Sequence, residues 1–133
     1  MRVFTNGCFD ILHRGHVELL KYCSSIACPA MGGCVVVGLN SDESVKKLKG
    51  DDRPINNQKD RKFLLQSLRF VDDVVIFEED TPYELIKRFE PDIIVKGGDY
   101  DPDTVVGSDL CEVRIFDHKE GYSTTNLLEG KSC

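Results

Sequence analysis

The apolar residues of this chain fall into short runs that alternate with segments of helical spacing. The run from Cys34 to Leu39 is continuously apolar, which is typical of a strand buried on both faces of a parallel sheet. Between the runs, residues such as Val17, Leu20 and Cys23 recur at the period of a helix. We therefore predict one α/β domain spanning residues 1–133, a doubly wound, Rossmann-like, five-stranded parallel sheet. The expected strands lie at 3–4, 34–39, 74–77, 93–95 and 113–116.

Capping residues and prolines mark the expected helix boundaries. Ser41 or Asp42 can cap a short helix after the second strand, and Ser123 is the expected cap of a final helix. The segment 81–84, Thr-Pro-Tyr-Glu, is predicted to be a capping box with proline at the first helical position. The apolar residues whose spacing indicates the intervening helices are Val45, Leu48, Phe63, Leu64, Leu65, Leu68, Leu85, Ile86 and Phe89.

Clusters of polar residues and glycines follow the predicted strands. They lie at residues 6–16, 40–42, 97–100 and 121–125. Ligands of open parallel sheets bind outside the carboxyl ends of the strands, at the point where the strand order reverses. These distant segments are therefore predicted to converge on one ligand site.

The first cluster has the features of a phosphate site between a strand and a helix. Gly7 permits a tight turn, and backbone N–H groups at the start of the helix favour an anion. His13 and His16 are three residues apart and can project from one side toward the same phosphate chain. The alternative is that the two histidines only cap the helix or face solvent.

The segment from Gly7 to His16 resembles the HxGH signature of the nucleotidyltransferase superfamily, which includes the cytidylyltransferases. Five further segments extend the resemblance to heptose 1-phosphate adenylyltransferases over nearly the whole chain. The glycerol-3-phosphate cytidylyltransferases are a more distant match, and they commonly have an arginine where this chain has His118. The five segments are 41–45, 48–54, 77–82, 96–100 and 121–126.

The resemblance implies transfer of AMP from ATP to a sugar 1-phosphate, expected to be D-glycero-D-manno-heptose 1-phosphate, with release of pyrophosphate. It implies Mg²⁺ bound with ATP and a place in lipopolysaccharide biosynthesis. A phosphate monoester is already an anion near neutral pH, so no general base is required. Two alternatives stay open: a cytidylyltransferase acting on glycerol 3-phosphate, and a non-catalytic nucleotide-binding module.

Site residues are expected from the pattern and the resemblance together. His13, His16 and Lys49 are the expected catalytic residues, because hydrogen bonds and positive charge stabilise the transferring phosphoryl group. No metal ligands and no role for His118 are expected. The expected nucleotide-binding residues are Asn6, Gly7, Cys8, Phe9, Gly15, Asp42, Gly97, Gly98, Asp99, Tyr100, Ser123, Thr124 and Thr125. The expected acceptor-binding residues are Asp10, Lys46, Arg53 and Arg61.

Each of these groups also has a plainer interpretation. Asp10 can simply form an Asx turn, and residues 97–100 can be an ordinary turn after a strand. Arg53 and Arg61 can form surface ion pairs. The lysines at positions 46, 47 and 49 can belong to a solvated helix face.

The net charge of -6 argues against a general nucleic-acid-binding protein, which needs a basic face. The six cysteines have no metal-binding spacing, and there is no signal peptide or long apolar run, so we expect a reducing cytoplasm and no membrane. A Cys28–Cys34 bridge and a metal or redox role remain alternatives. The expected partners are a nucleotide and a sugar phosphate, with a homodimer also implied. Because residue 2 already begins the first strand, the sugar kinase is expected to be a separate protein.

Overall fold

The computed structural model describes residues 1–117, which contain a five-stranded sheet in the order β3-β2-β1-β4-β5. Every neighbouring pair of strands is parallel, and β1 lies in the middle. The doubly wound Rossmann-like sheet and all five predicted strands are therefore confirmed. The predicted helix after Ser123 lies outside the described residues. The strands are β1 (Arg2–Gly7), β2 (Cys34–Asn40), β3 (Asp73–Phe77), β4 (Ile93–Gly97) and β5 (Glu112–Phe116).

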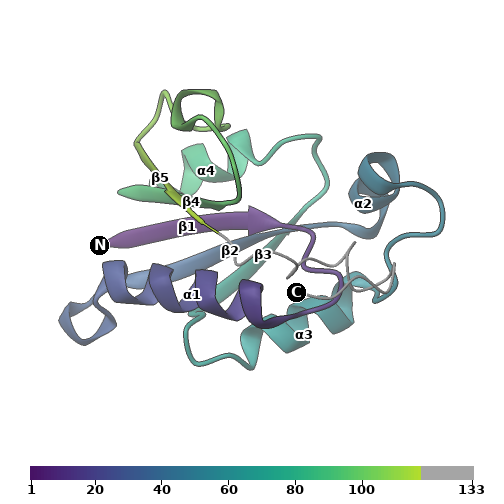
Figure 1. The fold of residues 1–133 in the computed structure, drawn as a ribbon, viewed down its shortest axis with the longest axis horizontal. Coiled ribbons are helices and arrows are strands. Elements are labelled where there is room, and N and C mark those ends of the chain that lie inside the picture. The colour runs from purple at the N-terminus through teal and green to yellow at the C-terminus, as the bar shows by residue number, and fades with distance from the viewer. Residues whose placement is uncertain (118–133) are drawn as a thin grey trace.

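Helices cover both faces of the sheet (Figure 1). α1 (Arg14–Ala27) and α3 (Gln58–Gln66) lie on one face, and α4 (Tyr83–Phe89) lies on the other. α2 (Asp42–Lys49) stands beyond the carboxyl ends of the strands, and the short 3₁₀ turns η1 (Pro29–Met31) and η2 (Pro102–Thr104) lie in connections. Within residues 1–117, loops and α2 thus occupy the carboxyl edge of the sheet.

The core follows from the two-residue period of the strands. In β1, Val3 packs with Leu19 and Cys23 of α1, whereas the next residue, Phe4, packs with Ile86 of α4. A third cluster joins α3 to the sheet through Leu65 and its apolar neighbours. Helices on both sides therefore fix the ends of the central strands, from which the site is built.

Several local predictions about helices need correction. The predicted capping box at 81–84 is wrong: α4 begins at Tyr83 after Pro82, and the Thr81 hydroxyl accepts a bond from the Tyr83 N–H over 3.5 Å. Proline at position 82 has no N–H, so it sits just before the helix. Ser41, and not Asp42, caps α2, because its hydroxyl accepts from the Ser44 N–H over 3.2 Å.

Two short helices bury fewer apolar side chains than their spacing suggests. Leu48 is 62% exposed, Phe63 68% and Leu64 41%, while Val45 and Leu65 are fully buried. α2 and α3 therefore each contact the sheet or its edge through only a narrow stripe of apolar side chains. Cys28 and Cys34 are both free thiols, so the alternative of a bridge between them is excluded.

Candidate active site

Three of the four segments predicted to converge lie at the carboxyl edge of the sheet, and the fourth, 121–125, lies outside the described residues. β1 is flanked by β2 on one side and β4 on the other, so the segments that follow Gly7, Asn40 and Gly97 start side by side. The chain leaves β1 for α1 on one face, whereas β4 is reached from α4 on the other (Figure 1). This is the point of reversal where open α/β sheets bind ligands.

The turn after β1 is built differently from the prediction. The residue in the left-handed region is Phe9, with φ of 45°, and Gly7 has no positive φ. Gly7 matters because a Cβ there would lie 3.2 Å from Cε2 of the Phe9 ring. The glycine therefore makes room for a buried aromatic side chain, and Phe9 takes on the backbone strain that turns the chain.

His13 and His16 cap α1 reciprocally. Nδ1 of His13 accepts from the Gly15 N–H over 3.1 Å, and Nδ1 of His16 accepts from the His13 N–H over 3.3 Å. The rings stack with their centroids 3.8 Å apart. Because each Nδ1 acts as an acceptor, the proton of each neutral imidazole is placed on Nε2. The capping interpretation is thus correct, and it places both histidines at the start of α1, beside the point of reversal of the sheet.

The turn between β1 and α1, residues 8–13, is called the signature turn. Asp10 joins this turn to the loop before α3. Its carboxylate accepts from Nε of Arg53 over 2.7 Å and from the N–H groups of Ile55 and Asn56, each over 2.9 Å. The Asn56 amide in turn donates to the Asp10 carbonyl over 2.9 Å. Burial would raise the pKa of the Asp10 carboxyl, but these donors outweigh it and hold the pKa below the ordinary value. Asp10 is 2% exposed, which does not fit the predicted contact with substrate, so it positions the loop.

Arg61 is fully buried beneath the same turn. Its guanidinium donates to the carbonyls of Cys8, Asn40 and Asn56 over 2.7 to 2.9 Å and to Oδ1 of Asp42 over 2.7 Å. The predicted contact with a substrate phosphate does not fit this geometry, and neither does a surface ion pair. Arg61 instead ties together the ends of β1 and β2 and the start of α3.

Arg53 combines the features of a structural residue with those of a candidate ligand contact. Its Nε pairs with Asp10, while its Nη2 is buried and has no hydrogen-bond partner in the part of the chain that the structure describes. A buried donor without a partner is costly. Arg53 therefore stays a candidate contact for an anionic group.

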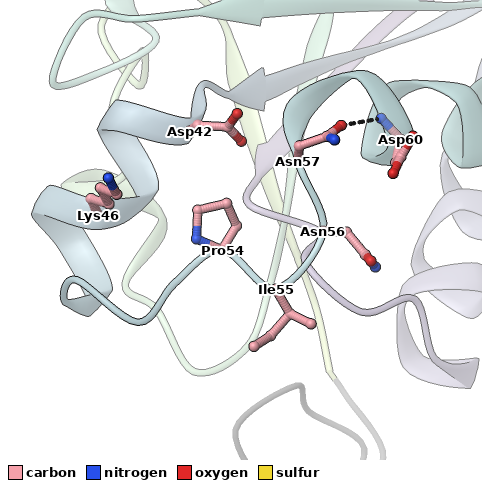
Figure 2. Close-up of a pocket in the computed structure, with 7 residues that line it drawn as sticks. All are labelled: Asp42, Lys46, Pro54, Ile55, Asn56, Asn57 and Asp60. Atoms are coloured by element: carbon pink, nitrogen blue, oxygen red, sulfur yellow. Dashed lines mark hydrogen bonds between the residues drawn. The ribbon is translucent and has the colours of Figure 1, made fainter.

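A pocket of about 320 Å³ opens between α2 and the loop that Asp10 holds. Figure 2 shows that Asp42 and Lys46 come from α2 and Asp60 from α3, with Pro54 of the loop lying between the two helices. The Asp42 carboxylate is fixed by Arg61, and the Asp60 N–H is capped by Oδ1 of Asn57 over 2.9 Å. The pocket is lined by Asp42, Lys46, Pro54, Ile55, Asn56, Asn57 and Asp60.

Positive side chains gather around the half-buried Cys8. Burial raises the pKa of its thiol above the ordinary 9.0, while Lys49, Arg61 and Lys96 act in the opposite direction. Lys49 is exposed at the end of α2. Lys96, near the end of β4, is not among the residues predicted from the sequence, although it stands next to the predicted Gly97. The signal that could have found it is a lysine at the carboxyl end of a strand that is otherwise apolar.

The remaining predicted residues that the structure describes belong to segments at the same edge. Gly15 is buried in the first turn of α1, and Asn6 is half-buried in β1. Gly98 has φ of 110° and donates to the Phe116 carbonyl over 3.0 Å, so the chain bends directly after Gly97, the last residue of β4, while it is still bonded to β5. Asp99 and Tyr100 are exposed. Ser123, Thr124, Thr125 and His118 lie outside the described residues.

Within residues 1–117, no group of three or more His, Cys, Asp or Glu side chains is arranged to hold a metal ion. None of their helices has the length and apolar character needed to cross a membrane.

Comparisons with known proteins agree on the family. The model of the family described as cytidylyltransferase-like matches residues 4–128. The bifunctional protein HldE of Nitratiruptor sp. is 62% identical over 133 residues, and that of Wolinella succinogenes is 56% identical over 128 residues. These alignments cover 98% and 96% of this chain but 28% and 26% of the relatives. The chain thus spans about a quarter of the length of the curated relatives it matches.

A solved structure shows the same fold over most of its length. It is the lipopolysaccharide core biosynthesis protein of Thermoplasma volcanium, which is 27% identical, with a TM-score of 0.69 over 90% of this chain and 96% of that one. The histidine pair, the parallel sheet and the match over residues 4–128 all lead to one conclusion. This chain belongs to the cytidylyltransferase-like family of nucleotidyltransferases.

Proposed function

We propose that this chain transfers AMP from ATP to a sugar 1-phosphate and releases pyrophosphate. The observation that carries the proposal is the reciprocal capping of His13 and His16 beside the point of reversal of the sheet, in which both Nδ1 atoms are acceptors and each ring carries its proton on Nε2. Lys49 adds positive charge near the same turn. Donors and cations fixed in advance stabilise charge that develops on a transferring phosphoryl group.

The proposed reaction needs positioning more than proton transfer. An oxygen of the sugar phosphate forms a bond to the α-phosphorus of ATP, and the bond from that phosphorus to the bridging oxygen of the β-phosphate breaks. The electron pair leaves with pyrophosphate, and the attacking oxygen is already anionic near neutral pH. Mg²⁺ enters with ATP as part of the substrate, bound to the phosphate oxygens.

We assign the acceptor sugar to the pocket between α2 and the loop before α3. Its volume of about 320 Å³ accommodates a monosaccharide, and its carboxylates and amides are groups that hydrogen-bond sugar hydroxyls. Lys46 lies at its border and supplies a positive charge for the acceptor phosphate. We propose D-glycero-D-manno-heptose 1-phosphate as the acceptor, because the segments from 41 to 126 resemble heptose 1-phosphate adenylyltransferases. The lipopolysaccharide role named for the Thermoplasma volcanium protein supports this choice.

We propose ATP over CTP as the nucleotide. Cytosine offers a carbonyl oxygen and a ring nitrogen as acceptors, which an arginine can satisfy, whereas adenine lacks the carbonyl. This chain has His118 where the glycerol-3-phosphate cytidylyltransferases commonly have that arginine. A site that pairs with one base rejects another when its polar groups are left unpaired.

We propose that the transferase works as a homodimer in the cytoplasm, and that a sugar kinase supplies its acceptor by phosphoryl transfer to the anomeric hydroxyl.

The test is pyrophosphate release with ATP or CTP, each against heptose 1-phosphate and glycerol 3-phosphate. We expect the highest kcat/KM with ATP and heptose 1-phosphate. Turnover of CTP with glycerol 3-phosphate at a higher kcat/KM would support the cytidylyltransferase alternative instead. Binding of ATP without turnover of any sugar phosphate would support the alternative of a non-catalytic nucleotide-binding module.

A further inference from the structure

Lys96 lies where the ligand is expected but has no role in the reaction as described so far. It is the residue before Gly97 at the carboxyl end of β4, and β4 is the direct neighbour of β1 in the sheet. Its side chain is half-buried. The strand residues before it, Ile93, Ile94 and Val95, are all buried and apolar, so the lysine stands at the point where the strand leaves the core.

Within residues 1–117, no carboxylate balances the charge of Lys96. Its Nζ lies 5.5 Å from the centroid of the Tyr100 ring, and its other charge interaction is with the thiol of Cys8. Burial raises the pKa of that thiol, which disfavours its charged form, so Cys8 is a poor anionic partner for the lysine. Burial also lowers the pKa of Lys96 itself.

A desolvated ammonium group without an anionic partner is unfavourable for the isolated protein. Ionisable groups that are perturbed by burial cluster at functional sites, which makes this lysine a candidate contact for a ligand. Lys49 acts on Cys8 as well, so ammonium groups from α2 and from β4 both influence the signature turn. Both residues are placed on the edge to which His13 and His16 belong.

We propose that Lys96 is a phosphate-binding residue that contacts a substrate phosphate group at the junction of β1 and β4. This inference rests on the proposed function for the identity of the substrates. The phosphate belongs either to the nucleotide or to the sugar 1-phosphate, and the chemistry is the same in both cases. Lys96 thereby extends the positive surroundings of the signature turn from α2 to the opposite side of β1.

The test compares Lys96→Met with the wild type and with Lys87→Met, which removes an exposed lysine of α4. Calorimetric titration uses three probes: inorganic pyrophosphate, an ATP analogue with a methylene group between the α- and β-phosphates, and heptose 1-phosphate. A charge-assisted hydrogen bond is worth about 1.5–3 kcal/mol, so we expect Kd to rise roughly 10- to 100-fold for at least one probe. Lys87→Met should bind like the wild type, and Lys96→Arg should recover part of the affinity.

The pattern across probes identifies the phosphate. Weaker binding of pyrophosphate and the ATP analogue assigns Lys96 to the nucleotide, whereas weaker binding of heptose 1-phosphate alone assigns it to the acceptor. Methionine keeps the apolar stem and removes the desolvated charge, so Tm should be unchanged or higher. The proposal is overturned if all three probes bind Lys96→Met within about twofold of the wild type, or if the wild type binds none of them.

These results are separable from those for the proposed function. A wild type that binds the probes but transfers no AMP would refute the proposed reaction, and the comparison with Lys96→Met would still decide the role of this lysine. A drop in Tm with unchanged binding would show that Lys96 is only structural.

Discussion

The rings of His13 and His16 hold each other in place: they stack with centroids 3.8 Å apart, and the His13 N–H donates to Nδ1 of His16 over 3.3 Å. Nδ1 of His13 accepts from the Gly15 N–H in the same turn. One set of contacts thus begins α1, fixes the tautomer of both rings and orients them. Structural and chemical roles of the pair are therefore coupled, and experiments must separate them.

The first prediction separates the two roles at position 13. Asparagine is a favourable N-cap whose side-chain oxygen can replace Nδ1 as acceptor, but it does not reproduce the Nε2–H donor. We expect His13→Asn to keep Tm close to the wild type while kcat falls on the order of 10²-fold. His13→Ala should lose a similar factor in kcat and about 1 kcal/mol of stability as well.

Kinetic assays with thermal unfolding check this prediction, with Arg14→Ala as a control on the exposed side of the same turn. His16→Ala should also lower kcat on the order of 10²-fold. The double variant should lose less in kcat than the product of the two single losses, because the rings act as a unit. A near-wild-type rate for His13→Asn would leave the pair a purely structural role.

The second prediction concerns the carboxylate of Asp10. Asp10→Asn breaks its ion pair with Arg53 and removes one of the oxygens that accept the N–H groups of Ile55 and Asn56. Because the pair is buried, we expect a loss of about 3 kcal/mol in the free energy of unfolding near neutral pH. Denaturant titration measures it, and pocket binding should weaken because the loop is released.

The pH dependence of this loss follows from the depressed pKa of Asp10. A carboxyl group whose pKa is lower in the folded state stabilises the protein fully above its ordinary value of 3.8, and that stabilisation disappears as the pH falls through the folded pKa. The difference between the wild type and Asp10→Asn should stay constant from about pH 8 to pH 5 and shrink only below about pH 4. A difference that already shrinks between about pH 7 and pH 5 would contradict this account.

The strands and the location of the site could be predicted because both depend on local or topological rules. The apolar run from Cys34 to Leu39 is buried whichever helix packs on it, and a parallel sheet necessarily gathers its strand ends on one edge. Arg61 could not be predicted in the same way. It lies in a polar stretch typical of a surface helix, and its burial depends on carbonyl groups of Cys8 and Asn40, which only the folded chain brings together.

The backbone conformation of the turn after β1 could not be predicted from the sequence either. A glycine before a phosphate loop suggests positive φ at that glycine, yet Phe9 adopts it. Burial of the Phe9 ring against Leu20 and Leu39 compensates for the strain, and that packing is a tertiary effect. The exposure of Phe63 likewise could not be seen from spacing, because a helix with several apolar residues need not bury all of them.

The third prediction tests Arg61 as a structural residue. Arg61→Met fills part of the volume but leaves the carbonyls of Cys8, Asn40 and Asn56 without their donor. Unsatisfied buried acceptors cost about 1–3 kcal/mol each, so we expect a loss of at least about 3 kcal/mol of stability. The variant Arg61→Lys should recover little of this loss, because an ammonium group cannot reproduce the fork of the guanidinium.

Thermal unfolding with and without an ATP analogue checks the role of Arg61. If the guanidinium is structural, both variants unfold at lower temperature, and any remaining folded fraction binds ATP with nearly normal affinity. Unchanged stability together with a large loss of ATP affinity would return Arg61 to the predicted role of phosphate ligand.

The last prediction assigns the pocket between α2 and the loop to the acceptor. Lys46 and Asp60 line it without belonging to the hydrogen-bonded core of the loop, so they can be changed with little effect on folding. If Lys46 meets the acceptor phosphate and the Asp60 carboxylate accepts from a sugar hydroxyl, Lys46→Met and Asp60→Asn should each raise KM for the sugar phosphate about tenfold. KM for ATP should hardly change, and Lys47→Met, which removes an exposed neighbour on α2, serves as the matched control. The KM values for both substrates separate the two subsites, because a pocket that holds the nucleotide would show the reverse pattern, with ATP weakened and the acceptor unaffected. In that case the acceptor would have to bind on the β4 side of the signature turn, next to Lys96 and Tyr100.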